Sequence, residues 1–191
     1  MNLLSTDIAH QHIAYTGFFE LNLSKKITKL SKSGGLMVDV GAKCGCYSLM
    51  WAAQNRENRV IAFEAVESNA DAMRENVNIN SLSEQITIVC KAAGKKSGNF
   101  YFDLGPSSQS TWGGFSMKKA TNKKVDVVTL DEYLSNIINI DVLKIDVEGA
   151  DTWVLYGAQK LLTEKRISNI FYEQNKMRLQ ALGIGLDDAQ N

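Results

Sequence analysis

Two carboxylates stand at the ends of two successive apolar runs and mark a candidate ligand site. Asp39 precedes a Gly41-x-x-x-Gly45 turn at the end of one run, and Glu64 closes the next run, residues 60–64. In a parallel α/β sheet the carboxyl ends of neighbouring strands meet at one edge, where ligands bind. A carboxylate placed like Glu64 accepts two hydrogen bonds from ribose hydroxyls. The spacing therefore indicates a site for a nucleoside-bearing cofactor.

The glycine spacing and Asp39 narrow the kind of cofactor. A pyrophosphate is usually held by Gly-x-Gly-x-x-Gly at a helix N-terminus, and the middle glycine is absent here. Asp39 would repel a diphosphate but suits a positively charged group, such as the amino acid end of S-adenosylmethionine. The small residues Ala92 and Ala93 follow a third apolar run and leave room for an adenine ring. The structural alternative makes Asp39 a helix cap and Glu64 a surface acid.

A further set of charged residues lies in a later apolar run. Lys144, Asp146 and Glu148 alternate with apolar residues, so their side chains share one face of a predicted strand. An alcohol nucleophile needs its proton removed or shared, and Asp146 is the candidate general base or substrate orienter. In this interpretation Lys144 positions Asp146, its nearest candidate partner, and Glu148 holds substrate or cofactor. In the alternative, Lys144 and Asp146 form a structural ion pair and Glu148 caps the following helix.

Strand-like and helix-like segments alternate along the chain, which predicts an α/β fold with a mostly parallel sheet and helices on both faces. The predicted strands are residues 36–41, 59–64, 86–91, 141–147 and 167–173. The predicted helices are residues 20–32, 46–54, 68–78, 131–137, 150–162 and 176–182. We expect a single domain overall, in which an N-terminal helical segment, residues 1–35, precedes the α/β domain, residues 36–191.

One insertion interrupts this alternation. Residues 99–103 and 125–129 both alternate like strands, and a Gly/Ser-rich loop, residues 105–114, lies between them. We expect this loop on the ligand-binding face, where Trp112 either stacks on substrate or serves as a packing plug.

The sequence continues only briefly beyond the last predicted strand. The 18 residues after Glu173 allow one helix but not two further strands. We therefore expect a sheet without the last two strands of the fold, either because the chain is a short variant or because its sequence is cut short. An open strand edge of this kind favours a homodimer. Tyr172 and Glu173 either line the acceptor side of the site or belong to the core.

Composition argues against several functions. The 21 basic and 21 acidic residues cancel, so the net charge gives no case for binding nucleic acid or a membrane surface. Three cysteines do not make a disulfide framework and indicate a reducing, cytoplasmic compartment. Cys44-x-Cys46 lacks the spacing of a zinc site, and no metal is expected. No apolar run approaches the roughly 18 residues that a membrane helix needs, and we expect no signal peptide.

The chain resembles the FkbM family of S-adenosylmethionine-dependent methyltransferases over most of its length. The resemblance rests on residues 15–20, 38–42, 61–64, 128–131 and 143–150, of which the last segment is the most specific. It implies a Rossmann-like class I methyltransferase fold with S-adenosyl-L-methionine as the cofactor. It also implies an O-methyltransferase that acts on a small-molecule hydroxyl acceptor, such as a sugar, a polyketide or another secondary metabolite.

The motifs and the resemblance together give the candidate site residues. The candidate cofactor-binding residues are Glu20, Asp39, Gly41, Ala42, Gly45, Glu64, Ala65, Ala92 and Asp146. The candidate catalytic residues are Asp146, Lys144 and Glu148. Glu20 is expected to close the pocket over the amino group of the cofactor; its alternative role is that of an acid in the first turn of a helix.

Two departures from the family pattern bear on function. The family commonly has Asn where this chain has Lys43. A cation beside a sulfonium cofactor is unfavourable unless it points outward or pairs with a carboxylate. The family also commonly has Pro soon after the ribose-binding Glu, where this chain has Ala65-Val66. The competing functions are a non-catalytic S-adenosylmethionine-binding module and a nicotinamide-dependent oxidoreductase.

Overall fold

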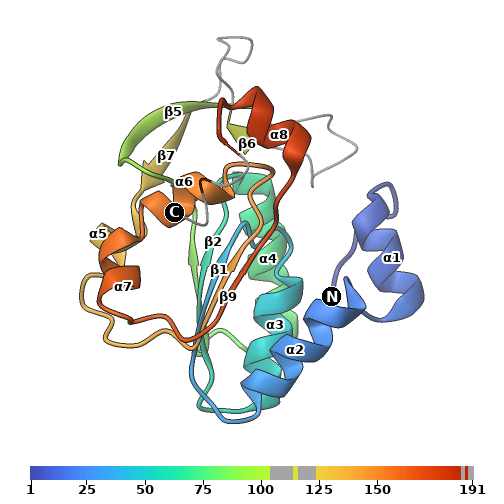
Figure 1. The fold of residues 1–191 in the computed structure, drawn as a ribbon. Helices are drawn as coiled ribbons and strands as arrows, with labels where there is room; N and C mark the ends of the chain where they lie inside the picture. Colours follow the sequence, from blue (N-terminus) through green and yellow to red (C-terminus); the bar gives the residue numbers. More distant parts are fainter. Residues whose placement is uncertain (104–113, 116–123, 186–187, 189–191) are drawn as a thin grey trace.

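A five-stranded parallel sheet in the order β3-β2-β1-β8-β9 forms the centre of the molecule (Figure 1). The computed structural model of the chain describes residues 1–103, 114–115, 124–185 and 188. The strands are β1 Leu36–Val40, β2 Arg59–Phe63, β3 Ile86–Val89, β8 Val142–Ile145 and β9 Ile170–Tyr172. Each strand lies within its predicted range, which confirms the parallel α/β sheet.

Helices cover both faces of this sheet, as predicted (Figure 1). One face carries α2 Leu21–Ser31, α3 Cys46–Gln54 and α4 Glu67–Ile79, with Ile27, Trp51 and Met73 in their shared core. The other carries α5 Leu130–Tyr133, α6 Asp151–Tyr156 and α7 Gln159–Thr163, with Leu130, Val154 and Leu161 in theirs. Because both faces are covered, the central strands read as continuous apolar runs.

The N-terminal helical segment contains two helices rather than the single predicted one. The additional helix is α1, Ile8–Thr16. The Asp7 carboxylate accepts hydrogen bonds from the backbone N–H groups of Ala9 and His10, and Gly17 ends the helix at φ 80°. An Asp and a Gly at this spacing are start and stop signals that the sequence does contain. In Figure 1, α1 stands apart from the sheet, beyond α2.

A smaller sheet in the order β4-β7-β5-β6 carries the predicted insertion. Its strands are β4 Ala92–Ala93, β5 Gly98–Asp103, β6 Gly114–Phe115 and β7 Lys124–Val128. β5 and β7 pair antiparallel, so both predicted alternating segments are strands. The predicted loop, except for Gly114, and Trp112 with it lie outside the described residues.

Three element boundaries were predicted wrongly. The third strand ends at Val89, and Ala92 belongs to β4, because the chain turns where the Lys91 N–H donates to the Val89 carbonyl at 2.8 Å. The predicted helix over 150–162 is two helices, broken at Gly157, where an added Cβ would lie 2.1 Å from the Gly94 carbonyl oxygen. The predicted helix over 131–137 is the short α5.

The C-terminal part holds α8, Lys176–Ala181, close to the predicted 176–182. Among the helices of the described residues, none is long and apolar enough to cross a membrane.

Candidate active site

The turn after β1 packs against the ends of both neighbouring strands. Gly41 has φ 77°, and an added Cβ would lie 2.0 Å from the backbone oxygen of Asp146. The N–H groups of Gly41 and Ala42 both donate to the Phe63 carbonyl at the end of β2. Gly41 therefore brings the carboxyl ends of β2 and β8 against the same turn, which is the edge where the sequence predicts a ligand.

Lys144 is buried in the central strand and meets two carboxylates. Its Nζ lies 3.2 Å from Asp39 Oδ1 and 3.6 Å from Asp146 Oδ2, and it donates to the Gly41 carbonyl at 3.2 Å. The expectation that Asp146 is the nearest partner was wrong, because β1 and β8 are adjacent and Asp39 is the register partner of Lys144. Asp39 also accepts from the Ser48 hydroxyl at 2.7 Å. It is thus a buried counter-ion rather than a helix cap.

The charges of this cluster stabilise one another. Burial alone lowers the pKa of Lys144, but the carboxylates of Asp39 and Asp146 outweigh it and hold that pKa above its ordinary value. Burial alone raises the pKa of Asp146, but Lys144 and Lys43 outweigh it and hold that pKa below its ordinary value. At neutral pH Asp146 is therefore a carboxylate and a weak proton acceptor, which suits an orienting role better than general-base catalysis.

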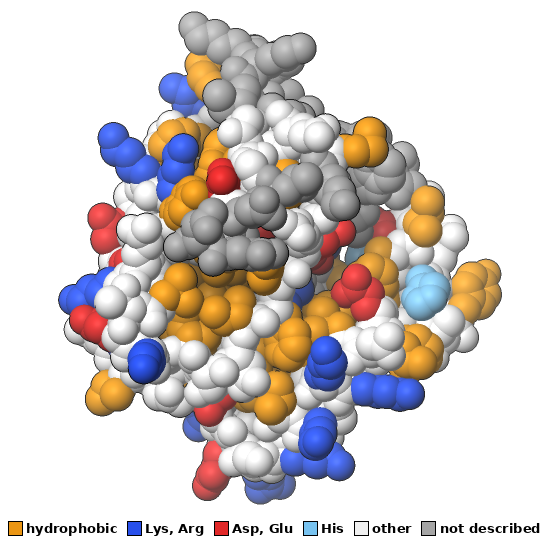
Figure 2. Space-filling view, in the orientation of Figure 1, with side chains coloured by type: hydrophobic (Ala, Val, Ile, Leu, Met, Phe, Trp, Pro, Cys, Tyr) orange, Lys and Arg blue, Asp and Glu red, His pale blue; other side chains and the backbone are white. Residues whose placement is uncertain are grey.

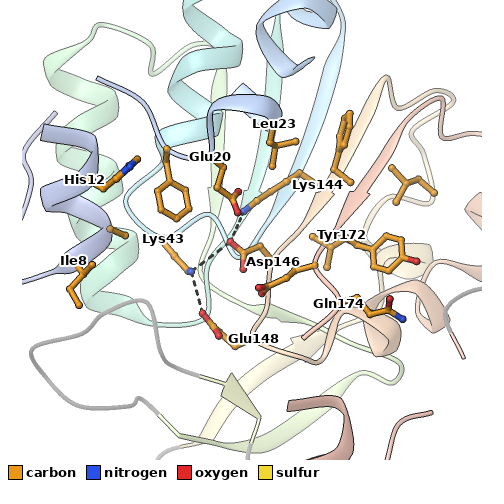
Figure 3. A pocket seen from close by; sticks show the side chains of 16 residues that line it. Ile8, His12, Glu20, Leu23, Lys43, Lys144, Asp146, Glu148, Tyr172 and Gln174 are labelled. Carbon is orange, nitrogen blue, oxygen red and sulfur yellow. Dashed lines mark hydrogen bonds and ion pairs between the residues drawn. The ribbon is translucent and has the colours of Figure 1, made fainter. Parts of the chain in front are cut away.

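Lys43 joins two strand ends, and its side-chain contacts with Asp146 and Glu148 are drawn in Figure 3. Its backbone N–H donates to Glu64 Oε2 at 2.8 Å, while its Nζ lies 3.6 Å from Asp146 and 3.4 Å from Glu148. Of the two conditions under which a cation here is tolerable beside a sulfonium, the second is met, because Lys43 pairs with carboxylates. The left-handed backbone of Lys43, φ 53°, directs its N–H and its side chain to these different carboxylates.

Glu64 is a buried acid rather than a surface one, with only 5% of its surface exposed. Its Oε1 accepts from the N–H of Val66 at 2.9 Å and from the Asn69 amide at 3.4 Å. Burial raises the pKa of Glu64 above its ordinary value against these hydrogen bonds. A carboxylate has about four acceptor positions, and the donors on Lys43, Val66 and Asn69 take three of those on Glu64.

A hollow of about 970 Å³ opens beside this cluster (Figure 3). From the candidate set it is lined by Glu20, Lys144, Asp146 and Glu148, together with Tyr172 and Glu173. The remaining candidates do not line it: Asp39, Gly41, Ala42, Gly45, Glu64, Ala65 and Ala92. The structure thus separates the candidates into those around the hollow and those around the turn and the end of β2, with Lys43 between them. In the described part of the chain, no group of three or more His, Cys, Asp or Glu could hold a metal.

The N-terminal segment supplies lining residues that the sequence analysis missed. They are Ile8, Ala9, His12, Phe19 and Leu23. Glu20, at the start of α2, accepts from the Tyr47 hydroxyl at 2.7 Å and makes no side-chain cap bond to its helix. The sequence signals for this wall were the helix-boundary residues around α1 and the family segment, residues 15–20, which contains Phe19 and Glu20.

Asp151 connects the two loops that border the hollow. Its buried carboxylate accepts from the N–H of Gly149 at 3.2 Å and from the N–H of Glu173 at 3.4 Å. The N-cap of α6 is Ala150, so the alternative role of Glu148 as the cap of this helix was wrong. Burial, and then the neighbouring Asp146, raise the pKa of Asp151 to about 7.

Asp151→Asn is expected to change how stability depends on pH. The folded pKa of about 7 exceeds the ordinary value of 3.8, so the folded state binds this proton more tightly than the unfolded state. The stability that Asp151 contributes is therefore full below about pH 4 and is lost as the pH rises through about 7. The other acids that face it, Asp146 and Glu173, are unchanged in the variant, so the substitution removes only the titration of Asp151.

Urea unfolding at pH 5 and pH 8 measures this effect. We expect the wild type to have a larger free energy of unfolding than Asp151→Asn at pH 5, and we expect this difference to disappear at pH 8. Exposed Asp126→Asn serves as the control and should show the same difference from wild type at both pH values. A pH-independent difference for Asp151→Asn would contradict the assigned titration.

The sheet order, the glycine turn and the acids at the strand ends define a Rossmann-like class I methyltransferase fold. A methyltransferase FkbM from Methylobacillus flagellatus KT aligns with TM-score 0.50 and 18% identity, covering 69% of this chain and 30% of that one. A precorrin-6Y C5,15-methyltransferase from Geobacter metallireducens GS-15 aligns with TM-score 0.50 and 12% identity, covering 85% and 68%. At these identities the likeness concerns the fold alone.

Residues 39–182 match the methyltransferase FkbM domain family, and the chain belongs to that family. The family resemblance predicted from the sequence is thereby confirmed. A search of curated proteins gave no match to this chain.

Proposed function

We propose that the protein transfers a methyl group from S-adenosylmethionine to the hydroxyl of a small molecule. The observation that carries this proposal is the Gly41 turn, which brings Glu64 and Asp146 to the two sides of Lys43 in a chain of the FkbM family. The adjoining hollow gives an acceptor access to the same strand ends.

The residues present fit the charge of this cofactor. Around the hollow, Glu20, Asp146, Glu148 and Glu173 provide four carboxylates against the two ammonium groups of Lys43 and Lys144, which suits a cationic ligand. We assign Glu64 to the ribose hydroxyls and Glu20 and Asp146 to the ammonium group. The backbone of Gly41, Ala42 and Gly45 and the small residues Ala65 and Ala92 are assigned to the nucleoside. Asp39 takes no direct part, since it fixes Lys144.

The described side chains can orient an alcohol for transfer. The bound cofactor supplies the methyl group, and the acceptor oxygen must lie in line with it at about 3 Å. Asp146 accepts a hydrogen bond from the hydroxyl, and Lys144 and Lys43 keep Asp146 ionised. Burial and the nearby Asp146 and Glu148 raise the pKa of Glu173, whereas the pKa of Asp146 is lowered. Glu173 is therefore a better proton acceptor than Asp146.

Calorimetric titration with S-adenosylhomocysteine and with NAD tests the cofactor assignment. We expect S-adenosylhomocysteine to bind and NAD not to bind. Glu64→Gln should weaken the binding of S-adenosylhomocysteine by at least about tenfold, because an amide with one acceptor oxygen replaces the carboxyl group assigned to the ribose hydroxyls. Glu57→Gln is the control. This exposed acid precedes the amino end of β2, whereas Glu64 follows its carboxyl end, so the substitution should leave the affinity unchanged.

The other outcomes identify the competing functions. Binding of NAD alone would favour the nicotinamide-dependent oxidoreductase. Binding of S-adenosylhomocysteine without methyl transfer to any of a broad set of hydroxyl acceptors would favour the non-catalytic binding module. Binding of neither ligand would overturn the proposal.

We further infer a cytoplasmic protein, supported by three free cysteine thiols. Self-association as a homodimer through β9 is supported by the place of this strand at the end of the sheet order.

A further inference from the structure

The hollow has two apolar walls on either side of a charged floor. Lys43, Lys144, Asp146 and Glu148 make up the floor. One wall comes from the N-terminal segment, where Ile8, Ala9, Phe19 and Leu23 lie beside the polar His12 and Glu20. The other is β9, with Ile170, Phe171 and Tyr172, and the polar Glu173 and Gln174 follow it. Figure 2 shows apolar side chains gathered on this face of the molecule, with acidic side chains among them. An exposed apolar surface around a polar floor is typical of a site for an organic ligand.

The N-terminal wall lies outside the family match, which begins at residue 39. Ile8 is 64% exposed although it lines the hollow, so its apolar surface meets no core. Phe19, by contrast, is held in place by edge-to-face contacts with His12 and Tyr47, at ring centroid distances of 6.2 and 6.5 Å. The wall therefore combines a fixed aromatic ring with an uncovered aliphatic side chain, which together suit a flat apolar body.

The charges of the hollow disfavour an anionic ligand. Lys43 pairs with Asp146 and Glu148, and Lys144 pairs with Asp39 and Asp146, so both lysines of the described lining are already neutralised. Glu20 and Glu173 add two further acids. Among the lining residues that the structure describes, a phosphate or carboxylate on the acceptor would meet carboxylates with no unpaired lysine or arginine to offset them.

From these observations we propose that the acceptor is an uncharged molecule with a flat apolar body. It lies between the N-terminal wall and β9 and presents its hydroxyl to Asp146. This inference rests on the proposed function and goes beyond it, because it separates apolar-bodied alcohols from free sugars and from anionic, phosphorylated or carboxylated acceptors. It also makes the N-terminal segment, through Ile8, a determinant of acceptor specificity.

Binding of three probes to the S-adenosylhomocysteine-saturated protein tests the proposal at pH 7. The probes are 2-naphthol, its anionic analogue 6-hydroxy-2-naphthoate, and methyl β-D-glucopyranoside. We expect 2-naphthol to bind at least about tenfold more tightly than either of the others. Equal or tighter binding of the naphthoate or the glucoside would overturn the proposal.

A pair of matched variants places the 2-naphthol site. Ile8→Asp puts a charge on the N-terminal wall and should weaken 2-naphthol by at least about tenfold. Ile138→Asp changes an isoleucine that is 86% exposed and does not line the hollow, so affinity should not change. Equal effects of the two substitutions would contradict the assigned wall. Failure of S-adenosylhomocysteine to bind would count against the proposed function, whereas its binding without a preference for 2-naphthol would count against this inference alone.

Discussion

Gly41→Ala is expected to leave little or no folded protein. The new Cβ would lie 2.0 Å from the Asp146 backbone oxygen, and backbone at the end of a central strand cannot rotate away as a side chain does. The turn would have to move from β8 and give up its hydrogen bonds to the Phe63 carbonyl. We expect a loss of more than about 4 kcal/mol, a large part of the roughly 5–15 kcal/mol that stabilises a domain. Urea unfolding followed by circular dichroism measures it.

Gly17→Ala separates this clash from backbone strain. Gly17 has φ 80°, close to the 77° of Gly41, but nothing lies within 4 Å of its added Cβ. Gly17→Ala should lower the free energy of unfolding only by what alanine loses in a left-handed conformation, about 1–2 kcal/mol. Similar losses in the two variants would show that strain, and not the contact with Asp146, makes Gly41 necessary.

Lys144→Met is expected to destabilise the protein by about 3–5 kcal/mol, the usual result of removing one partner of a buried ion pair. Asp146 keeps Lys43 as a partner, but Asp39 is 1% exposed and would keep only the Ser48 hydroxyl. The free energy of unfolding from urea titration at pH 7 checks this value.

The double variant Asp39→Asn/Lys144→Met tests whether charge is the cause. It removes both members of the buried pair, so most of the stability lost in Lys144→Met should return. If the double variant were as unstable as the sum of the two single ones, the loss would instead come from packing around the Lys144 side chain.

The sequence predicted what depends on local pattern. Each strand of the parallel sheet was recognised from an apolar run, and the Gly41 turn and the acids Glu64 and Asp146 were recognised from their place after such runs. The pairing of Asp39 with Lys144 was missed, because it depends on the register of two strands about a hundred residues apart. The break at Gly157 was missed for a similar reason, since its cause is the approach of Gly94.

The candidate site was predicted at its floor, at Glu20 and, as one of two alternatives, at Tyr172 and Glu173. Its N-terminal wall depends on where α1 lies relative to β9, and no periodicity within either segment encodes that placement. Asp151 was not recognised because an Asp in the first turn of a helix is common on surfaces, and only its burial makes it titrate near pH 7.

The double attachment of Lys43 has a thermodynamic consequence. Its main chain is held by Glu64 and its ammonium group by Asp146 and Glu148, so one residue senses both ends of the site. A ligand that hydrogen-bonds to Glu64 would compete with the Lys43 N–H for that carboxylate. Any resulting shift of Lys43 would change the position of its ammonium group, and so the electrostatic potential at the floor where a second ligand binds. Such coupling is reciprocal, because each ligand changes the affinity of the protein for the other ligand by the same factor. With the cofactor and the acceptor bound as proposed, Lys43 would make the two binding events interdependent without any movement of the sheet.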